Sequence, residues 1–183
     1  MLFRSIVVLV GRSGAGKSTL ARCLAGREPW DAGTVRVHER SLRPTQIVPA
    51  QVQLVSQEPS ESLNPRWSIG ECFQEACANS GSSMLEQMRM PSAWLDRKIH
   101  ELSEGQRARI AIARSIGALD SGLLILDESL AGLDPVTLAR VMEFVQASQV
   151  RKRLGCLLIT HDDEVAEAYA SRVVHLEEGR VAA

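Results

Sequence analysis

Residues 11–18 read Gly-Arg-Ser-Gly-Ala-Gly-Lys-Ser, which matches the pattern G-x-x-x-x-G-K-[ST]. The apolar run Ile6–Val10 precedes this stretch, and a segment of helical character, Lys17–Ala25, overlaps its end. Glycines let a backbone turn tightly enough for successive N–H groups to point at one phosphate group, and the following helix start adds positive partial charge. The sequence therefore predicts a strand, a phosphate-binding loop and a helix in this order.

The loop also predicts individual contacts to a nucleoside triphosphate. We expect Lys17 to contact the β- and γ-phosphates, Ser18 to ligate Mg²⁺ and Thr19 to contact the α-phosphate. Kinases and GTPases share this loop, so alone it indicates only nucleotide binding. The predicted nucleotide-binding residues of this segment are Gly11, Arg12, Ser13, Gly14, Ala15, Gly16, Lys17, Ser18 and Thr19.

Strand-like and helix-like segments alternate along the chain, which predicts an α/β fold with a largely parallel sheet covered on both faces. The other expected strands are Thr34–His38, Val52–Ser56, Leu123–Leu126, Cys156–Thr160 and Val173–Leu176. The other expected helices are Gln106–Gly117, Pro135–Arg153 and Glu164–Ala170. Residues 68–100 are expected to be helical, with breaks at Gly81-Ser82-Ser83 and Pro91. We predict a single domain over residues 1–183, with residues 64–101 forming an inserted helical subdomain.

Composition narrows the range of partners. The chain has 21 basic and 22 acidic residues, so it predicts no nucleic-acid partner. Ile6–Val10 is too short for a signal peptide or a membrane span, so we expect a soluble protein that reaches a membrane only by docking on other subunits. The cysteines form no C-x-x-C pair, which favours small buried residues in a reducing compartment. They are Cys23, Cys72, Cys77 and Cys156.

A second cluster follows the apolar segment Leu123–Leu126, which ends in Asp127 and Glu128. Two adjacent carboxylates at the end of a buried strand suit a magnesium ion and a proton-accepting role. We expect Asp127 to hold Mg²⁺ through water and Glu128 to polarise the water that attacks the γ-phosphate. The alternative interpretation is that both acids are simply solvated at the start of a loop. The presence of the phosphate loop argues against this alternative.

Leu102-Ser103-Glu104-Gly105-Gln106, directly before an expected helix, resembles the signature sequence of ABC ATPases. The usual form is LSGGQ, so Glu104 is a departure that either weakens closure or points to solvent. The resemblance implies that Ser103, Gly105 and the start of the helix at Gln106 bind the γ-phosphate of ATP held by a second ABC ATPase domain. Free N–H groups at a helix start suit an anion. Alone, Ser103-Glu104 would be an ordinary helix cap followed by a first-turn acid.

Three further positions match the same family in order. Gln57 resembles the glutamine that senses Mg²⁺ and the attacking water, and His161 resembles the switch histidine that contacts the γ-phosphate. Leu130-Ala131-Gly132-Leu133-Asp134 resembles the D-loop, in which Asp134 would help to link two sites. The resemblance covers nearly the whole chain. It implies a P-loop NTPase fold with a RecA-like core, a reduced N-terminal antiparallel β part and a short inserted helical subdomain.

The stretch from Gln57-Glu58-Pro59 through Ser62–Arg66 is similar to ATPases of dipeptide, oligopeptide and nickel importers. This resemblance implies ATP hydrolysis that powers import of small peptides or nickel. The implied partners are a second ABC ATPase domain and membrane-spanning permease subunits, and the implied location is cytoplasmic, at the inner face of the cell membrane. A soluble ABC-type ATPase, for example in phosphonate metabolism, and a truncated, weakly active nucleotide-binding module are the alternatives.

Two departures from the family affect these expectations. Only ten residues precede Gly11, whereas the family has two further strands there and an aromatic residue that stacks on adenine. Unless Phe3 or Trp30 substitutes, we expect weak nucleotide affinity and relaxed discrimination between ATP and GTP. The helical arm between Gln57 and Ser103 is short, which leaves the identity of the membrane partner open.

Overall fold

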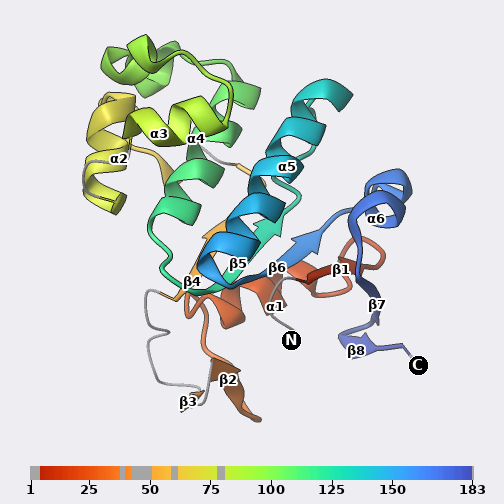
Figure 1. Ribbon diagram of the computed structural model, residues 1–183. Helices are drawn as coiled ribbons and strands as arrows, with labels where there is room; N and C mark the ends of the chain where they lie inside the picture. The colour runs from red at the N-terminus through yellow and green to blue at the C-terminus, as the bar shows by residue number, and fades with distance from the viewer. Residues whose placement is uncertain (1–4, 38–39, 43–50, 59–61, 78–80, 183) are drawn as a thin grey trace.

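The structure is a computed structural model that describes residues 5–37, 40–42, 51–58, 62–77 and 81–182. Six strands form the main sheet in the order β4-β5-β6-β1-β7-β8 (Figure 1). The first five strands in this order run parallel, and β8 pairs antiparallel with β7. Their bounds are β1 Ile6–Val10, β4 Val52–Val55, β5 Gly122–Asp127, β6 Leu154–Ile159, β7 Arg172–Glu177 and β8 Arg180–Val181. The predicted α/β fold with a mainly parallel sheet is confirmed.

The sheet register brings the ends of four parallel strands to one edge. Leu9 and Asp127 both pair with Ile159, and Val55 pairs with Leu126. Since parallel strands share their direction, the segments that leave β1, β4, β5 and β6 begin at the same edge. Those segments carry the phosphate loop, Gln57, the acid pair and His161, so the topology collects most of the predicted site residues.

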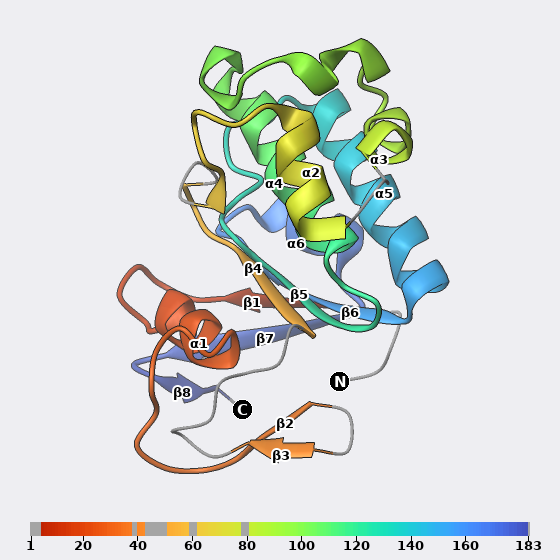
Figure 2. The ribbon, with the colours of Figure 1, turned by 90° about the vertical axis from the view of Figure 1, so that its left-hand side faces the viewer.

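Both faces of the sheet are covered along β4, β5, β6 and β1, as continuous apolar strands require, whereas β7 and β8 are largely exposed. Val8 and Leu126 point to the face covered by α4 (Glu104–Gly117) and α5 (Pro135–Lys152). Leu9 and Ile125 point to the face covered by α1 (Lys17–Leu24). Figure 2 shows α1 on one side of the sheet and α4 and α5 on the other. Every residue of β6 is buried, because this strand lies between β5 and β1 and is covered on both faces of the sheet.

A separate antiparallel pair lies beyond α1. It consists of β2 (Val35–Val37) and β3 (Arg40–Leu42), and Figure 2 shows it below the main sheet. This pair agrees with the reduced antiparallel part that the family resemblance implied. The predicted strand Thr34–His38 is therefore β2, while His38 lies outside the described residues.

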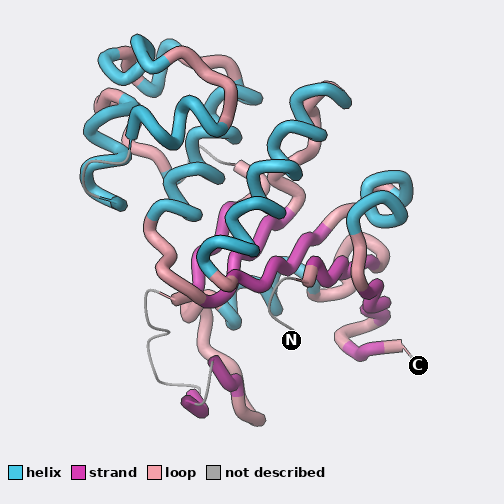
Figure 3. Tube along the Cα trace, viewed as in Figure 1, coloured by secondary structure: helices cyan, strands magenta, loops and turns pink. Residues whose placement is uncertain are grey.

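The segment between the strands β4 and β5 is mainly helical, as the colouring in Figure 3 shows. It contains α2 (Ile69–Cys77), α3 (Gly81–Gln87), the 3₁₀ helices η2 (Ser92–Asp96) and η3 (Ile99–Glu101), and then α4. Backbone hydrogen bonds from Ile69 N to Arg97 O and from Ile99 N to Trp67 O join the start of α2 to the stretch between η2 and η3. The interpretation of residues 64–101 as an inserted subdomain stays a prediction.

The expected helix break at Gly81-Ser82-Ser83 is wrong, because α3 begins at Gly81 and includes these residues. Close packing explains the glycine: a Cβ atom there would lie 3.0 Å from Leu95 Cδ2. The break at Pro91 is confirmed, since α3 ends at Gln87 and Pro91 precedes η2. Gly81 is therefore a closely packed helical residue rather than a helix break.

Other helix bounds differ from the prediction by small amounts. Helix α4 begins at Glu104, earlier than the expected Gln106, because Ser103 caps it. Helix α5 ends at Lys152, and Arg153 follows it in the left-handed conformation. Helix α6 spans Asp163–Tyr169, capped by Asp162. Within the described ranges, no helix combines the length and the apolar character needed to cross a bilayer.

Lys152 joins the ends of two helices. Its Nζ donates to the carbonyl oxygens of Ile116 (2.9 Å), Gly117 (3.2 Å) and Leu119 (2.6 Å). These groups lie at the end of α4, where helical carbonyls lack partners within the helix. Burial lowers the pKa of Lys152, although the half-buried amine keeps these three acceptors.

We expect Lys152→Met to lower the free energy of unfolding by about 2 kcal/mol. The substitution removes a charge-assisted hydrogen-bond donor and leaves the three carbonyl oxygens without it. Urea denaturation monitored by circular dichroism measures this change. Lys98→Met is the matched control, since the Lys98 amine lies at the surface, where it pairs with Glu71. Equal destabilisation by both substitutions would contradict this role for Lys152.

Candidate functional site

Three glycines shape the loop between β1 and α1. Gly14 and Gly16 have φ angles of 81° and 98°, which side chains rarely tolerate. A Cβ atom on Gly11 would lie 2.2 Å from the carbonyl oxygen of Leu176 on β7, so this position has no room for a side chain. The loop is closed by a hydrogen bond from Ala15 N to Arg12 O (3.1 Å). The positive φ angles of Gly14 and Gly16 agree with the tight turn that the sequence predicted, whereas Gly11 is required by the approach of Leu176.

Lys17 turns its amine back over this loop. Its side chain is buried, and Nζ donates to the carbonyl oxygens of Gly11 (2.8 Å) and Arg12 (3.1 Å). Ser18 follows in the first turn of α1, and Thr19 is exposed. The structure thus holds a cation at the mouth of the loop, where the predicted β- and γ-phosphates would lie.

Asp127 ends β5 beside Ser18. It is 5% exposed, and its Oδ1 atom is buried without a hydrogen-bond partner among the described residues. Burial raises the pKa of Asp127, and the charge of Glu128 adds to this effect, whereas a hydrogen bond with the Ser18 side chain opposes it. A buried carboxylate oxygen with unused acceptor capacity next to a serine hydroxyl fits Mg²⁺, which prefers hard oxygen ligands.

This environment carries a cost in stability that a substitution can reveal. Because the pKa of Asp127 is raised on folding, its charged form destabilises the folded state above that raised pKa. The penalty disappears when the pH falls below the unfolded pKa of an aspartate, about 4. We therefore expect Asp127→Asn to raise the free energy of unfolding of nucleotide-free protein at pH 7 and to have little effect near pH 3.

Urea titrations at several pH values measure this difference, with Asp163→Asn on exposed α6 as the control. In the presence of Mg²⁺ and ATP the order should reverse, because the substitution removes the proposed magnesium contact. A lower stability of Asp127→Asn without nucleotide would contradict the account of this carboxylate.

Glu128 and His161 lie close together at the wall of a small cavity. Glu128 has a φ angle of 50°, and its N–H donates to Ile159 O (3.0 Å). Its Oε2 atom lies 3.7 Å from His161 Nδ1, and the histidine side chain is 71% exposed against 22% for the glutamate. The cavity measures about 160 Å³. Its lining consists of Glu128, Leu130, Ala131, Gly132, Leu138, Ile159, Thr160, His161, Asp162 and Val165.

Two residues that sequence reasoning missed hold the His161 segment. Thr160 Oγ1 accepts from Asp162 N (3.0 Å), and Asp162 Oδ1 accepts from Glu164 N (2.9 Å) and Val165 N (3.2 Å). Asp162 thereby caps α6 and fixes the turn that begins at the end of β6. The signal was available, because an aspartate directly before a helical segment is a preferred cap.

Gln57 lies at the same edge of the sheet. It is exposed and follows Ser56 directly beyond the end of β4. The register of β4 against β5 places it on the side of the sheet edge where Asp127 ends its strand. Its predicted role toward Mg²⁺ and water stays a prediction.

The signature residues occupy a different part of the chain. Ser103 Oγ accepts from Gln106 N (3.3 Å), and Gln106 Oε1 accepts from Ser103 N (3.0 Å), so these two residues cap α4. A Cβ atom on Gly105 would lie 3.2 Å from Leu133 Cδ2. Figures 1 and 2 both show the beginning of α4 well away from the loop between β1 and α1. One chain therefore does not bring Ser103, Gly105 and Gln106 to its own phosphate loop.

Asp134 also has a structural role. Its Oδ1 atom accepts from Thr137 N (3.0 Å), so it caps α5, and the contacts with Thr137 hold its pKa below the usual range. The side chain is exposed, which leaves its predicted part in linking two sites as a prediction.

Of the two residues that could replace the adenine-stacking aromatic, the structure describes only Trp30. Trp30 is partly buried, packs against the core on the α1 face, and has a buried Nε1 atom. Its possible role as a substitute for the stacking residue stays a prediction. Phe3 lies outside the described residues. Weak nucleotide affinity stays a prediction.

The cysteines were expected to be small buried residues, and two of the four are fully buried. Cys72 and Cys156 are buried, and burial raises their pKa to about 11 and about 12. Cys23 and Cys77 are half-buried, and burial raises the pKa of each. Over the described part of the chain, no group of three or more histidine, cysteine, aspartate or glutamate side chains is arranged to hold a metal ion.

The family model described as ABC transporter matches residues 4–131, which is more than half of the chain. The chain belongs to the ABC transporter family. The predicted family is confirmed. The matched region contains the phosphate loop, the signature sequence and the acid pair.

Relatives within this family carry import functions in their names. A putative peptide import ATP-binding protein of Brucella abortus is 33% identical over 94% of this chain and 57% of its own length. The nickel import ATP-binding protein NikE of Shigella flexneri is 33% identical over 96% of this chain and 71% of its own length. The chain therefore spans little more than half the length of the peptide-import relative.

Solved structures share the fold. A dimeric ATP-binding cassette in a post-hydrolysis state, bound to ADP and Pi, superposes with a TM-score of 0.82 at 20% identity, over 99% of this chain and 84% of that one. The protein cbiO1 of Clostridium perfringens, part of the ABC transporter complex cbiONQ, gives a TM-score of 0.80 at 24% identity, over 98% and 76% of the two chains. At these identities the likeness establishes the fold of this ABC transporter family member.

Proposed function

We propose that this chain binds ATP with Mg²⁺, hydrolyses it, and thereby powers import of small peptides or nickel across a membrane. One observation carries the proposal. Lys17 on the phosphate loop, Asp127 beside Ser18, and Glu128 facing His161 all lie at the same edge of one parallel sheet. A triphosphate held by the loop would have its terminal phosphate near the two acids.

The loop supplies binding. Backbone N–H groups of residues 11–18 and the start of α1 would surround the β-phosphate, and Lys17 would exchange its carbonyl acceptors for phosphate oxygens. Ser18, Asp127 and Gln57 would hold Mg²⁺. When bound, the ion would neutralise charge on the phosphates.

Glu128 supplies the proton acceptor. Its carboxylate is mostly buried at the cavity, with the exposed His161 3.7 Å away. In this position Glu128 would orient a water molecule and accept its proton, while His161 would contact the γ-phosphate. Thr160 and Asp162 would keep His161 in place through the turn that they form.

A second ATPase domain would complete the site. Ser103, Gly105 and the start of α4 at Gln106 lie away from the loop of their own chain, so they would serve nucleotide held by another domain. Asp134 would lie where the two domains meet. Closure on ATP and opening after hydrolysis would provide the motion that drives transport.

The names of the relatives support import as the process that this motion drives. The chain would then act at the cytoplasmic face of a membrane, in a complex with membrane-spanning permease subunits. Peptides and nickel are the two cargo classes that these names favour, and cargo choice would depend on other subunits.

Purification of the tagged Glu128→Gln chain from membranes of its own host, with Mg²⁺ and ATP present, tests this proposal. Permease subunits should co-purify, and the complex with wild-type chain should hydrolyse ATP faster when it is supplied with peptides or nickel. Recovery of only soluble proteins, with cargo-independent hydrolysis, would favour a soluble ABC ATPase instead.

A further inference from the structure

The pair Asn64-Pro65 forms a tight turn that the site described above does not use. Trp67 N donates to Asn64 O (3.1 Å), and Arg66 N donates to Asn64 Oδ1 (3.0 Å). Asparagine at the first position and proline at the second are favoured in a turn of this kind, because the asparagine side chain bonds the backbone and proline fixes φ. The turn therefore fixes the direction in which the Pro65 carbonyl points.

This carbonyl contacts His100, which lies 35 residues further along the chain. His100 Nδ1 donates to Pro65 O (3.0 Å), and His100 N donates to the same oxygen (3.3 Å). A carbonyl oxygen accepts two hydrogen bonds and donates none, so Nδ1 carries the proton in this contact. His100 thus holds one carbonyl with both its backbone and its side chain.

The contact closes a short backbone ladder, which consists of residues 65–69 and 97–100. An antiparallel bridge joins Ser68 to Lys98 within it, and the backbone hydrogen bonds described above flank this bridge. His100 is the last residue of the ladder before the start of α4. The ladder therefore connects the segment that follows β4 to the segment that leads into α4.

One short turn separates this ladder from α4. His100 lies within η3, and Leu102 N donates to Ile99 O (3.2 Å) where this turn ends. Ser103 follows directly and caps α4. Ile99 and Leu102 are buried, so the turn is held against the core on both sides of the exposed histidine. A displacement of His100 relative to the ladder would therefore also displace Ser103.

The His100 ring contributes little to the stability of the whole domain. Its side chain is exposed and its acceptor is a neutral carbonyl, and hydrogen bonds of this kind replace bonds to water with a small net gain. A rigid ring that bridges two segments instead restricts where one segment lies relative to the other. The geometry thus suits His100 to positioning rather than to holding the fold together.

We propose that His100 is a positioning residue for Ser103: its hold on the Pro65 carbonyl keeps the cap of α4 where a phosphate contact needs it. This inference rests on the proposed function, in which Ser103 serves nucleotide bound by a second domain. A misplacement of about 1 Å at such a contact can lower a rate on the order of 100-fold. His100 acts through Ser103 and does not itself touch nucleotide.

Two substitutions of similar size separate the hydrogen bond from the shape of the side chain. His100→Asn places an amide N–H donor near the position of Nδ1, whereas His100→Leu has no donor. Phosphate release at saturating ATP and Mg²⁺ measures the rate of hydrolysis, and binding of a fluorescent ATP analogue to dilute protein measures affinity. His100→Leu should lower the rate about tenfold and change the affinity less than about twofold. His100→Asn should restore the rate to within about threefold of wild type.

Hydrogen–deuterium exchange of the nucleotide-free chain adds a readout that does not depend on hydrolysis. His100→Leu should remove protection from amides of residues 99–106, which His100→Asn should retain, while residues 11–25 should exchange as in wild type. His175→Leu, at an exposed position on β7, is the matched control and should change neither hydrolysis nor this exchange. Circular dichroism and thermal unfolding establish that each variant is folded.

A second route to the same contact starts from the turn. Asn64→Ala removes the side-chain acceptor that helps to orient the Pro65 carbonyl, so it should lower the rate in the same direction by a smaller factor. Added to His100→Leu it should cost little more, because both substitutions loosen one contact. This variant tests the inference even where His100→Leu fails to fold.

Three results would overturn the inference and leave the proposed function intact. They are wild-type hydrolysis by folded His100→Leu and Asn64→Ala chains, equal losses in His100→Leu and His100→Asn, and a loss of ATP affinity as large as the loss of rate. The last result would place the effect at the phosphate loop of the same chain. A wild-type chain that hydrolyses no ATP would overturn the proposed function and this inference together.

Discussion

Lys17→Ala should weaken ATP binding by about 30- to 100-fold, because it removes a charge-assisted contact that the loop is built to direct at phosphate. In the structure this amine is buried and donates to two neutral loop carbonyls, and it forms no ion pair within the part of the chain that the structure describes. Equilibrium binding of a fluorescent ATP analogue in the presence of Mg²⁺ measures the loss.

The fold should survive this substitution, since removal of a buried cation leaves carbonyls that solvent at the loop mouth can reach. Lys98→Ala is the matched control, because Lys98 lies in the helical segment and pairs with Glu71. Affinity should stay unchanged in the control. Wild-type affinity in a folded Lys17→Ala protein would show that the loop does not bind nucleotide as proposed.

Glu128→Gln should lower the rate of ATP hydrolysis by about 100-fold or more while ATP still binds, because the amide keeps the size of the side chain but cannot accept a proton. The mostly buried carboxylate of Glu128 lies 3.7 Å from His161 Nδ1, at the cavity beyond the ends of β5 and β6. Phosphate release at saturating ATP measures the rate, and analogue binding measures the affinity.

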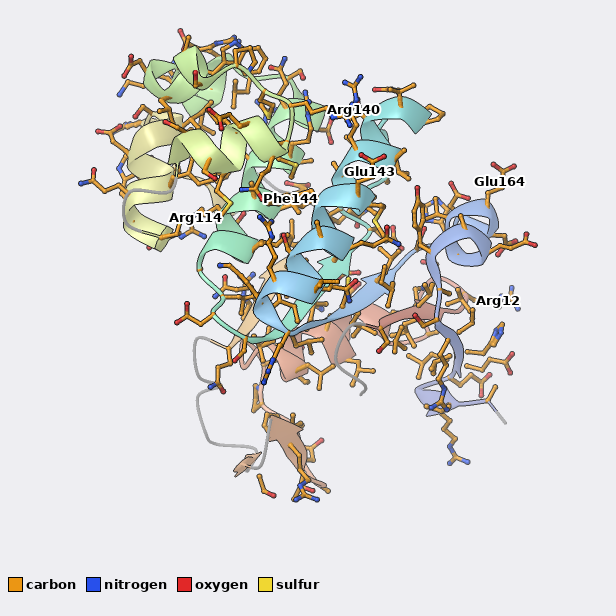
Figure 4. The ribbon with its side chains drawn as sticks, viewed as in Figure 1. Arg12, Arg114, Arg140, Glu143, Phe144 and Glu164 are labelled. Atoms are coloured by element: carbon orange, nitrogen blue, oxygen red, sulfur yellow. The ribbon has the colours of Figure 1, made fainter. Side chains whose placement is uncertain are left out.

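Glu164→Gln is the matched control for this experiment. Glu164 also follows the His161 turn, but it lies on the exposed outer side of α6, as Figure 4 shows. The control should hydrolyse ATP at the wild-type rate. Equal background rates for wild type and Glu128→Gln would instead indicate a weakly active binding module.

Local patterns in the sequence predicted much of the fold and the site. The phosphate loop, the apolar strand that ends in Asp127 and the Ser103 cap are each encoded within a few neighbouring residues. The alternation of strands and helices then implied a parallel sheet. Because parallel strands run in the same direction, their carboxyl ends lie at the same edge of the sheet. These features needed no knowledge of contacts between distant segments.

Features that depend on distant contacts escaped prediction. Gly81 lies inside α3, close to Leu95, and Lys152 reaches carbonyls at the end of α4. The lack of a side chain at Gly11 reflects the approach of Leu176 from β7. The unused acceptor on Asp127 likewise depends on which groups surround it in three dimensions.

Multiple-turnover phosphate release by purified wild-type chain measures directly whether this chain is a magnesium-dependent ATPase. With Mg²⁺ and ATP we expect steady hydrolysis that rises more than in proportion to protein concentration, because two ATPase domains would form each site, and that stops when EDTA removes Mg²⁺. Absence of hydrolysis above the Glu128→Gln background at any protein concentration would show that the chain does not hydrolyse ATP.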